Sequence, residues 1–145
     1  MKLVSIAPNA HYDMTHGQPK TLEKDNDGSC IVRLNVAPEM GIPGGDIANQ
    51  SADVEEVQTG WSCYEVRTFA APTKANLKKA IIRSIVDETA EFDLVNSYNK
   101  HTLEIKVDET AVQKYKDFLT LTEEIDAVLV EILKTTPTFS RSVSA

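Results

Sequence analysis

Three side chains that can bind a metal ion lie close together near the start of the chain. His11, Asp13 and His16 form an H-x-D-x-x-H pattern. Two imidazoles and a carboxylate can hold a divalent cation if a turn brings them together. The same segment is rich in Pro, Gly and Asn, which is typical of a solvated polar loop. We favour the loop, and keep a metal site, with the metal-dependent enzyme that would use it, as the alternative.

The other reactive side chains follow no catalytic pattern. The two cysteines, Cys30 and Cys63, each lie in an apolar run typical of a strand and form no CxxC pair. We predict that they are small buried side chains in neighbouring strands. The sequence also contains no GxSxG, P-loop, HExxH or GxGxxG motif. We therefore expect a protein that is not an enzyme and uses no cofactor.

Composition excludes two classes of partner. The chain has 145 residues, with 22 acidic and 15 basic side chains and a formal net charge of −7. Such a charge argues against a surface that coats nucleic acid. No apolar stretch approaches the roughly 20 residues of a membrane span, and the apolar run at the N-terminus is too short for a signal peptide. We expect neither a nucleic-acid nor a membrane partner.

The acidic side chains are concentrated in the first part of the chain. Residues 1–60 hold nine acids and four bases. A small cytosolic regulatory or inhibitor protein, whose acidic region masks a basic surface, would have this distribution. An acidic solvated loop face would have it as well.

Periodicity predicts an α+β fold. Residues 30–36 alternate between apolar and mostly polar side chains, as a half-buried strand does. We predict a small N-terminal antiparallel sheet with strands near 2–7, 29–37 and 61–70, followed by a C-terminal helical part with two short helices and one long helix. The sheet and its loops (1–70) and the helical part (73–133) form a single domain (1–133), and residues 134–145 form a C-terminal arm.

The helix boundaries follow from capping residues. Thr73 is a suitable N-cap for a helix that extends to about Val86, and Asp108 for the long helix. A second short helix contains residues 92–98 and ends near Asn99, where His101 is expected to cap carbonyl groups. Residues 102–107 alternate apolar and charged side chains, which predicts a short exposed strand.

The long helix carries a heptad pattern. Apolar side chains and one threonine step by four and three residues at Ala111, Tyr115, Phe118, Thr122, Ile125, Leu129 and Ile132. The seam either packs on the helix's own domain or joins copies of the chain. Thr120–Glu123 can also divide it into two helices. Our interface candidates are Tyr115, Phe118, Ile125, Leu129, Ile132 and Phe139; Trp61 and Tyr64 are candidate contact or core residues.

The order of signals over about residues 60–133 resembles a family of phage proteins. These signals are Gly60-Trp61-Ser62-Cys63-Tyr64-Glu65, the step Pro72-Thr73, Ala80-Ile81-Ile82, and Tyr115-Lys116-Asp117-Phe118. In this order they resemble the small virion-associated fibre, head or tail accessory proteins of tailed phages of gut Bacteroidales.

The resemblance implies a non-enzymatic structural or adaptor component of a bacteriophage virion. Such a protein is made in the host bacterial cytoplasm and acts by protein–protein contacts in an oligomeric assembly. Its partners would be other phage structural proteins or copies of itself, and we expect a homo-oligomer.

Overall fold

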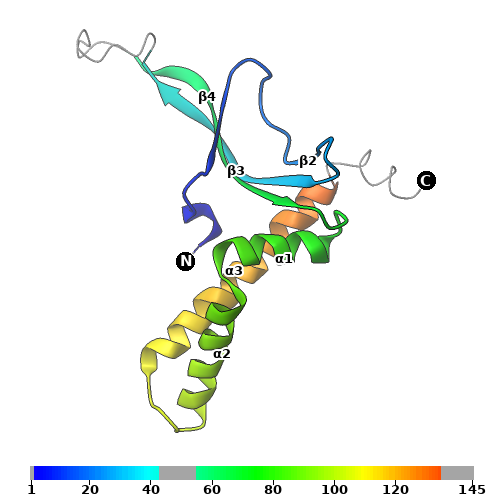
Figure 1. Cartoon of the computed structure of the whole chain (residues 1–145). Coiled ribbons are helices and arrows are strands. Elements are labelled where there is room, and N and C mark those ends of the chain that lie inside the picture. Colours follow the sequence, from blue (N-terminus) through cyan, green and yellow to red (C-terminus); the bar gives the residue numbers. More distant parts are fainter. Residues whose placement is uncertain (1, 43–54, 135–145) are drawn as a thin grey trace.

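A computed structural model describes residues 2–42 and 55–134, and it has the predicted α+β fold, with an antiparallel sheet followed by helices (Figure 1). The strands are β1 (Ala10–Asp13), β2 (Leu22–Lys24), β3 (Cys30–Gly41) and β4 (Val57–Thr68). The helices are α1 (Lys74–Ile85), α2 (Glu88–Thr102) and α3 (Glu109–Lys134). The predicted C-terminal arm beyond Lys134, with Phe139, lies outside the described residues.

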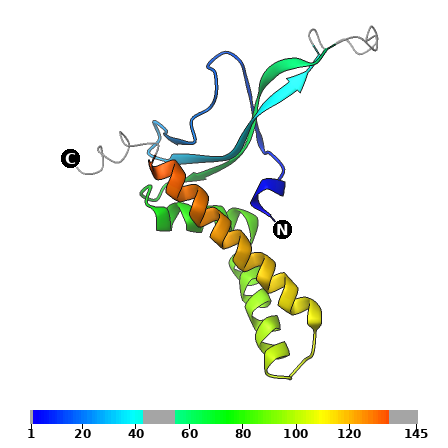
Figure 2. The ribbon, with the colours of Figure 1, turned by 180° about the vertical axis from the view of Figure 1, so that it is seen from behind.

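The sheet has the order β1-β4-β3-β2, and every neighbouring pair is antiparallel. The long strands β3 and β4 form its centre, and the short strands lie at its edges. The β3–β4 register shifts between Leu34 and Ala37, where Asn35 adopts a positive φ of 55°. Asparagine tolerates this conformation better than most residues, and such a bulge increases local twist. Beyond it, the two strands continue as a ribbon away from the helices (Figures 1 and 2).

The core lies between one face of the sheet and two helices. Val32, Leu34 and Val66 point from β3 and β4 toward α1 and α3, whose side chains complete one cluster of buried residues: Leu77, Ile81, Leu121, Ile125, Leu129 and Ile132. Burial of each such side chain contributes roughly 1.5–3 kcal/mol. The heptad seam of α3 therefore packs inside this chain over the C-terminal half of the helix.

Local capping explains where the helices begin. The Thr73 side chain accepts a hydrogen bond from the Asn76 N–H at the start of α1, as predicted. Asp108 accepts one from the Thr110 N–H, 3.1 Å away, at the start of α3. The helix α3 is continuous through Thr120–Glu123, so the prediction of one long helix is confirmed and the alternative of two helices is wrong. The Thr122 hydroxyl donates back to the Leu119 carbonyl and caps no new helix.

Helices α2 and α3 form an antiparallel hairpin. Its α2 and the N-terminal half of α3 extend beyond the sheet and α1 (Figures 1 and 2). The turn at its tip has Glu104 at a φ of 60°, with Glu104 N–H donating to the His101 carbonyl and Ile105 N–H to the Lys100 carbonyl. This pattern is a Schellman motif.

Two predicted strands are wrong. Residues 102–107 lie at the end of α2 and in the tip, where no described strand pairs with them. The Lys100 carbonyl accepts the N–H groups of Ile105 and Lys106 instead. Within residues 2–7, Leu3–Ser5 form a 3-10 helix. The Ser5 N–H and hydroxyl both donate to the Lys2 carbonyl, and the Leu3 N–H donates to Glu124 on α3. Local hydrogen bonds thus replace the predicted sheet bonds.

The sequence-based account also missed two strands and a histidine contact. The edge strand β1 begins inside the predicted polar loop, and β2 was not predicted. His101 was expected to cap carbonyl groups, but its Nδ1 accepts the Asp108 N–H at 3.0 Å. Here the imidazole joins the two ends of the hairpin turn.

Candidate functional site

A buried arginine organises the sheet face opposite the helices. Arg33 on β3 pairs in register with Glu65 on β4, and its Nε donates to Glu65 Oε1 at 2.8 Å. One terminal nitrogen lies 2.8 Å from Glu23 Oε1 on β2, and the other donates to the Lys20 carbonyl at 2.9 Å. The Tyr12 hydroxyl from β1 accepts from Arg33 and donates to Glu65. One side chain thus links all four strands and the β1–β2 loop.

The electrostatics of this cluster favour fixed protonation states. Hydrogen bonds from Arg33 to Tyr12, Glu23 and Glu65 outweigh burial and raise the pKa of Arg33, so the guanidinium remains charged. Burial, followed by the hydrogen bond to Glu65, raises the pKa of the Tyr12 hydroxyl. A neutral tyrosine and a permanent cation suit a structural role better than proton transfer near neutral pH. We call this cluster of Tyr12, Glu23, Arg33 and Glu65 the clamp.

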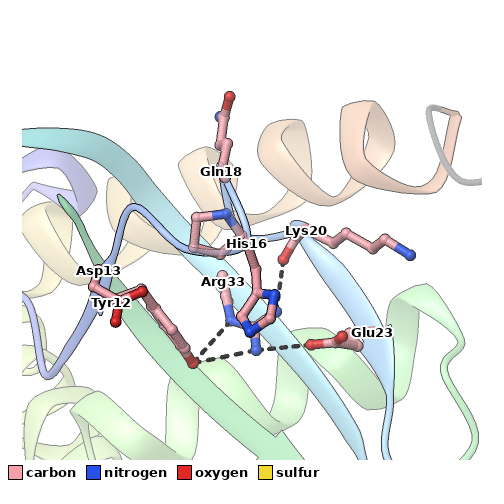
Figure 3. Close-up of a pocket in the computed structure, with 9 residues that line it drawn as sticks. Tyr12, Asp13, His16, Gln18, Lys20, Glu23 and Arg33 are labelled. Atoms are coloured by element: carbon pink, nitrogen blue, oxygen red, sulfur yellow. Dashed lines mark hydrogen bonds and ion pairs between the residues drawn. The ribbon is translucent and has the colours of Figure 1, made fainter.

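Figure 3 shows the pocket beside this clamp, with a volume of about 310 Å³. The β1–β2 loop supplies most of its wall, including His16, Gln18 and Lys20, while Tyr12, Glu23 and Arg33 form its base. Four of the five guanidinium N–H groups of Arg33 already have acceptors within the chain. Arg33 therefore offers a ligand at most one free donor.

The three side chains predicted to bind a metal have other contacts in the structure. His11 Nδ1 contacts both carboxylate oxygens of Glu39, at 2.8 and 2.9 Å. Asp13 accepts the Thr15 N–H, which lowers the pKa of its carboxyl group. Asp13 and His16 both line the pocket. Across residues 2–42 and 55–134, no three His, Cys, Asp or Glu side chains are grouped so that they could hold a metal ion.

The cysteines lie where the sequence predicted them. Cys30 on β3 and Cys63 on the neighbouring strand β4 are both buried and unbonded to each other. Burial raises the pKa of both thiols, which makes them poor nucleophiles.

Much of the N-terminal acidity is compensated within the chain. Glu23 pairs with Arg33, while Asp25 and Asp27 pair with Arg67. The Arg67 guanidinium holds the pKa of Asp25 below its ordinary value. These carboxylates fasten the sheet and the β2–β3 turn, so an acidic face built from them would be partly neutralised.

The predicted interface residues of α3 are mostly buried within the chain. Phe118 is buried, and Ile125, Leu129 and Ile132 belong to the core. Tyr115 is half-buried and its ring lies 5.0 Å from that of Tyr98 on α2. Of the two other aromatic candidates, Tyr64 packs against the core and bonds to Ser84, while the Trp61 indole nitrogen is buried with no partner in the described part of the chain.

The hairpin carries several uncovered apolar side chains. Helix α2 has no buried residue, although it is 15 residues long. At the tip, Leu103, Ile105 and Val107 are 68%, 72% and 70% exposed. Single exposed apolar side chains are common on protein surfaces, but three within five residues at a projecting tip form a patch.

A groove follows the same hairpin. It has a volume of about 360 Å³, and its lining extends from Val86, just before α2, to Asp108, just before α3. Its walls carry small or aliphatic side chains from both helices, with charged groups along the rim: Ala90, Asp93, Leu94, Ser97, Ala111 and Lys114. The hairpin thus combines an apolar tip with an elongated groove, a combination suited to contact with another macromolecule.

Comparison of the chain with protein-family models, with curated proteins and with solved structures finds no match. Within residues 2–42 and 55–134, no helix is both long enough and apolar enough to cross a membrane.

Sequence reasoning missed both the clamp and the hairpin. The only local signal for the clamp is that Arg33 and Glu65 each interrupt a strand of largely apolar residues, and their pairing depends on a register that the sequence did not specify. Two signals for the hairpin were present in the sequence. Helix α2 has few apolar residues, and residues 102–107, which were interpreted as a strand, contain three aliphatic side chains.

Proposed function

We propose that this protein is a non-enzymatic adaptor that binds other proteins through the α2–α3 hairpin. The resemblance stated above suggests a bacteriophage virion as its setting, with other phage structural proteins or copies of itself as partners. In that setting the chain is made in the host bacterial cytoplasm and functions in the particle.

The observation that carries this proposal is the exposure of the hairpin. Helix α2 packs mainly on α3, is joined to α1 by the Arg83–Glu91 ion pair, and buries none of its residues completely. An isolated helix of this length is marginally stable in water, so tertiary contacts normally stabilise it. Covering Leu103, Ile105 and Val107 would contribute about 1–2 kcal/mol for each side chain. A partner would supply both the missing contacts and this burial.

The location of the reactive side chains supports a binding role. The buried cysteines have raised pKa values, and the charged cluster around Arg33 is internally paired. These groups stabilise the sheet that holds the C-terminal half of α3. The sheet and α1 then form a rigid base from which the hairpin projects (Figure 1).

The test uses Ile105→Asp and a matched control. Ile105 is 72% exposed at the tip, whereas Phe69, which directly follows the last residue of β4, is 71% exposed. Each aspartate variant should fold, because neither side chain is in the core, and circular dichroism checks this. The tagged chain is co-expressed with the products of the neighbouring genes, and the proteins that co-purify are quantified by mass spectrometry.

We expect Ile105→Asp to lose the co-purifying protein, whether another gene product or an untagged copy of the chain, and Phe69→Asp to retain it. Equal retention by the two variants would contradict a binding role for the hairpin. So would the absence of any co-purifying gene product or second copy with the wild-type chain.

A further inference from the structure

We propose that the partner in the hairpin groove is a second copy of this chain, with α2 of one copy antiparallel to α2 of the other. This inference rests on the proposed function and specifies its partner. The two hairpins would together form a four-helix bundle around a twofold axis, which is the commonest symmetry of protein dimers.

Charge along α2 provides the first argument. Asp93 and Lys100 are two helical turns apart and therefore lie on nearly the same face. Both are exposed, and neither side chain has an ion pair within residues 2–42 and 55–134. A twofold axis between Asn96 and Ser97 places Asp93 opposite Lys100 of the second copy. The same operation repeats the pair, so a single register satisfies both charges of both chains.

The ends of α2 have the same complementarity. Its first turn carries the acid Glu88 and also Glu91, which is paired with Arg83 of α1, and its last turn carries the bases Lys100 and His101. Antiparallel packing places the acidic end of one helix beside the basic end of the other, and also opposes their helix dipoles favourably. Parallel packing would instead place like charges together.

The groove fits this arrangement sterically. Ala90, Ser97 and Ala111 provide small side chains along its wall, which allows two helices to approach closely. In the register set by Asp93 and Lys100, Leu103 of one copy lies opposite Ala90 of the other. The apolar tip would then cover the base of the partner's groove, so the two exposed features of the hairpin complete each other. An unrelated helix could also fill the groove, but only a second copy necessarily carries charges that complement Asp93 and Lys100.

Two experiments on the full chain test the proposal. The first measures molar mass by light scattering across a concentration series for the wild type, Asp93→Lys, Lys100→Asp and the double charge reversal. Either single variant places like charges together twice per dimer and should weaken the dimer about tenfold or more. The double variant restores both pairs and should recover most of the affinity. A control, Lys79→Asp on the exposed side of α1, should leave the dimer unchanged.

The second experiment traps the axis. Ser97→Cys places one thiol beside its symmetry mate, and a short bismaleimide should cross-link the two chains. Lys79→Cys should not cross-link under the same conditions. The native thiols of Cys30 and Cys63 are buried and should not compete.

The outcomes separate this proposal from the broader one. A monomeric wild type, or a dimer that neither charge variant weakens, overturns the second-copy proposal. If Ile105→Asp still abolishes co-purification of another gene product, the hairpin remains a binding site for a different protein. If the chain is monomeric and Ile105→Asp changes nothing, both proposals fail.

Discussion

Replacement of Arg33 tests whether the charged cluster is a structural clamp. Arg33→Met removes the cation but retains most of the side-chain volume. Arg33 is only 5% exposed, and the Glu65 side chain beside it is 24% exposed, so the variant leaves a poorly solvated carboxylate without its partner. Removing one partner of a buried ion pair costs about 3–5 kcal/mol. We take the lower end, because Glu65 retains some solvent contact.

The other contacts of Arg33 add less. Glu23 is 44% exposed and can be hydrated after the substitution, so its loss should cost under about 1 kcal/mol. The Lys20 carbonyl loses a donor at a cost of about 1 kcal/mol. The expected loss in free energy of unfolding is therefore roughly 3–5 kcal/mol, a large share of the 5–15 kcal/mol typical of a domain.

Urea unfolding followed by circular dichroism measures this loss. Arg83→Met is the matched control, because its ion pair with Glu91 joins side chains that are 35% and 27% exposed and it should cost under about 1 kcal/mol. The double variant Arg33→Met, Glu65→Leu removes both charges and should recover more than half of the loss. A loss below about 1 kcal/mol for Arg33→Met would refute the clamp.

Three further substitutions test the backbone and the ion pairs. Gly60→Ala should destabilise the fold by about 1–3 kcal/mol in thermal unfolding, because its Cβ would overlap the Tyr12 carbonyl oxygen of β1; an unchanged melting temperature would show that β1 lies farther away. Glu104→Gly should stabilise the chain by about 0.5–1 kcal/mol in urea, because it relieves a positive φ of 60° at the hairpin tip, and a loss of stability would argue against the Schellman turn. Lys78 holds the pKa of Asp126 below its ordinary value of 3.8, so this carboxylate stabilises the fold above that pH and ceases to do so as the pH falls through its lower folded value. The stability difference between wild type and Asp126→Asn should accordingly be constant above about pH 5 and shrink below pH 3.8, and a difference independent of pH would contradict the pairing.

Features that depend on local sequence could be predicted well. Thr73 and Asp108 identified the starts of two helices because an N-cap acts over three residues. Alternation located most of β3 and most of β4, because each strand has one face toward the core. The α+β class followed from these elements alone.

Features that depend on distant partners could not be predicted. The edge strands β1 and β2 are short, and only their pairing with β4 and β3 makes them strands. The alternation of residues 102–107 had no such partner, so the chain formed a turn. The heptad pattern of α3 fitted internal or intermolecular packing equally well, and the position of α1 decided the matter for Ile125 and Leu129.

The candidate sites show the same division. The sequence identified His11, Asp13 and His16 by type and spacing, but His11 contacts Glu39, Asp13 accepts the Thr15 N–H, and the described residues contain no metal-binding group. Conversely, Arg33 and Glu65 are remote in sequence and meet through β-sheet register. The exposure of the hairpin tip depends on the direction in which α2 projects, and no local sequence pattern predicts that direction.

Amide hydrogen exchange of residues 88–108, compared between the isolated chain and its assembled state, tests the central claim most directly. In the isolated chain, α2 should exchange much faster than α1, because it buries no residue completely. Assembly, as a dimer or with a co-purified gene product, should slow exchange in this segment more than anywhere else. Unchanged exchange there, with new protection on the sheet or on α1, would show that the protein binds its partners through another surface.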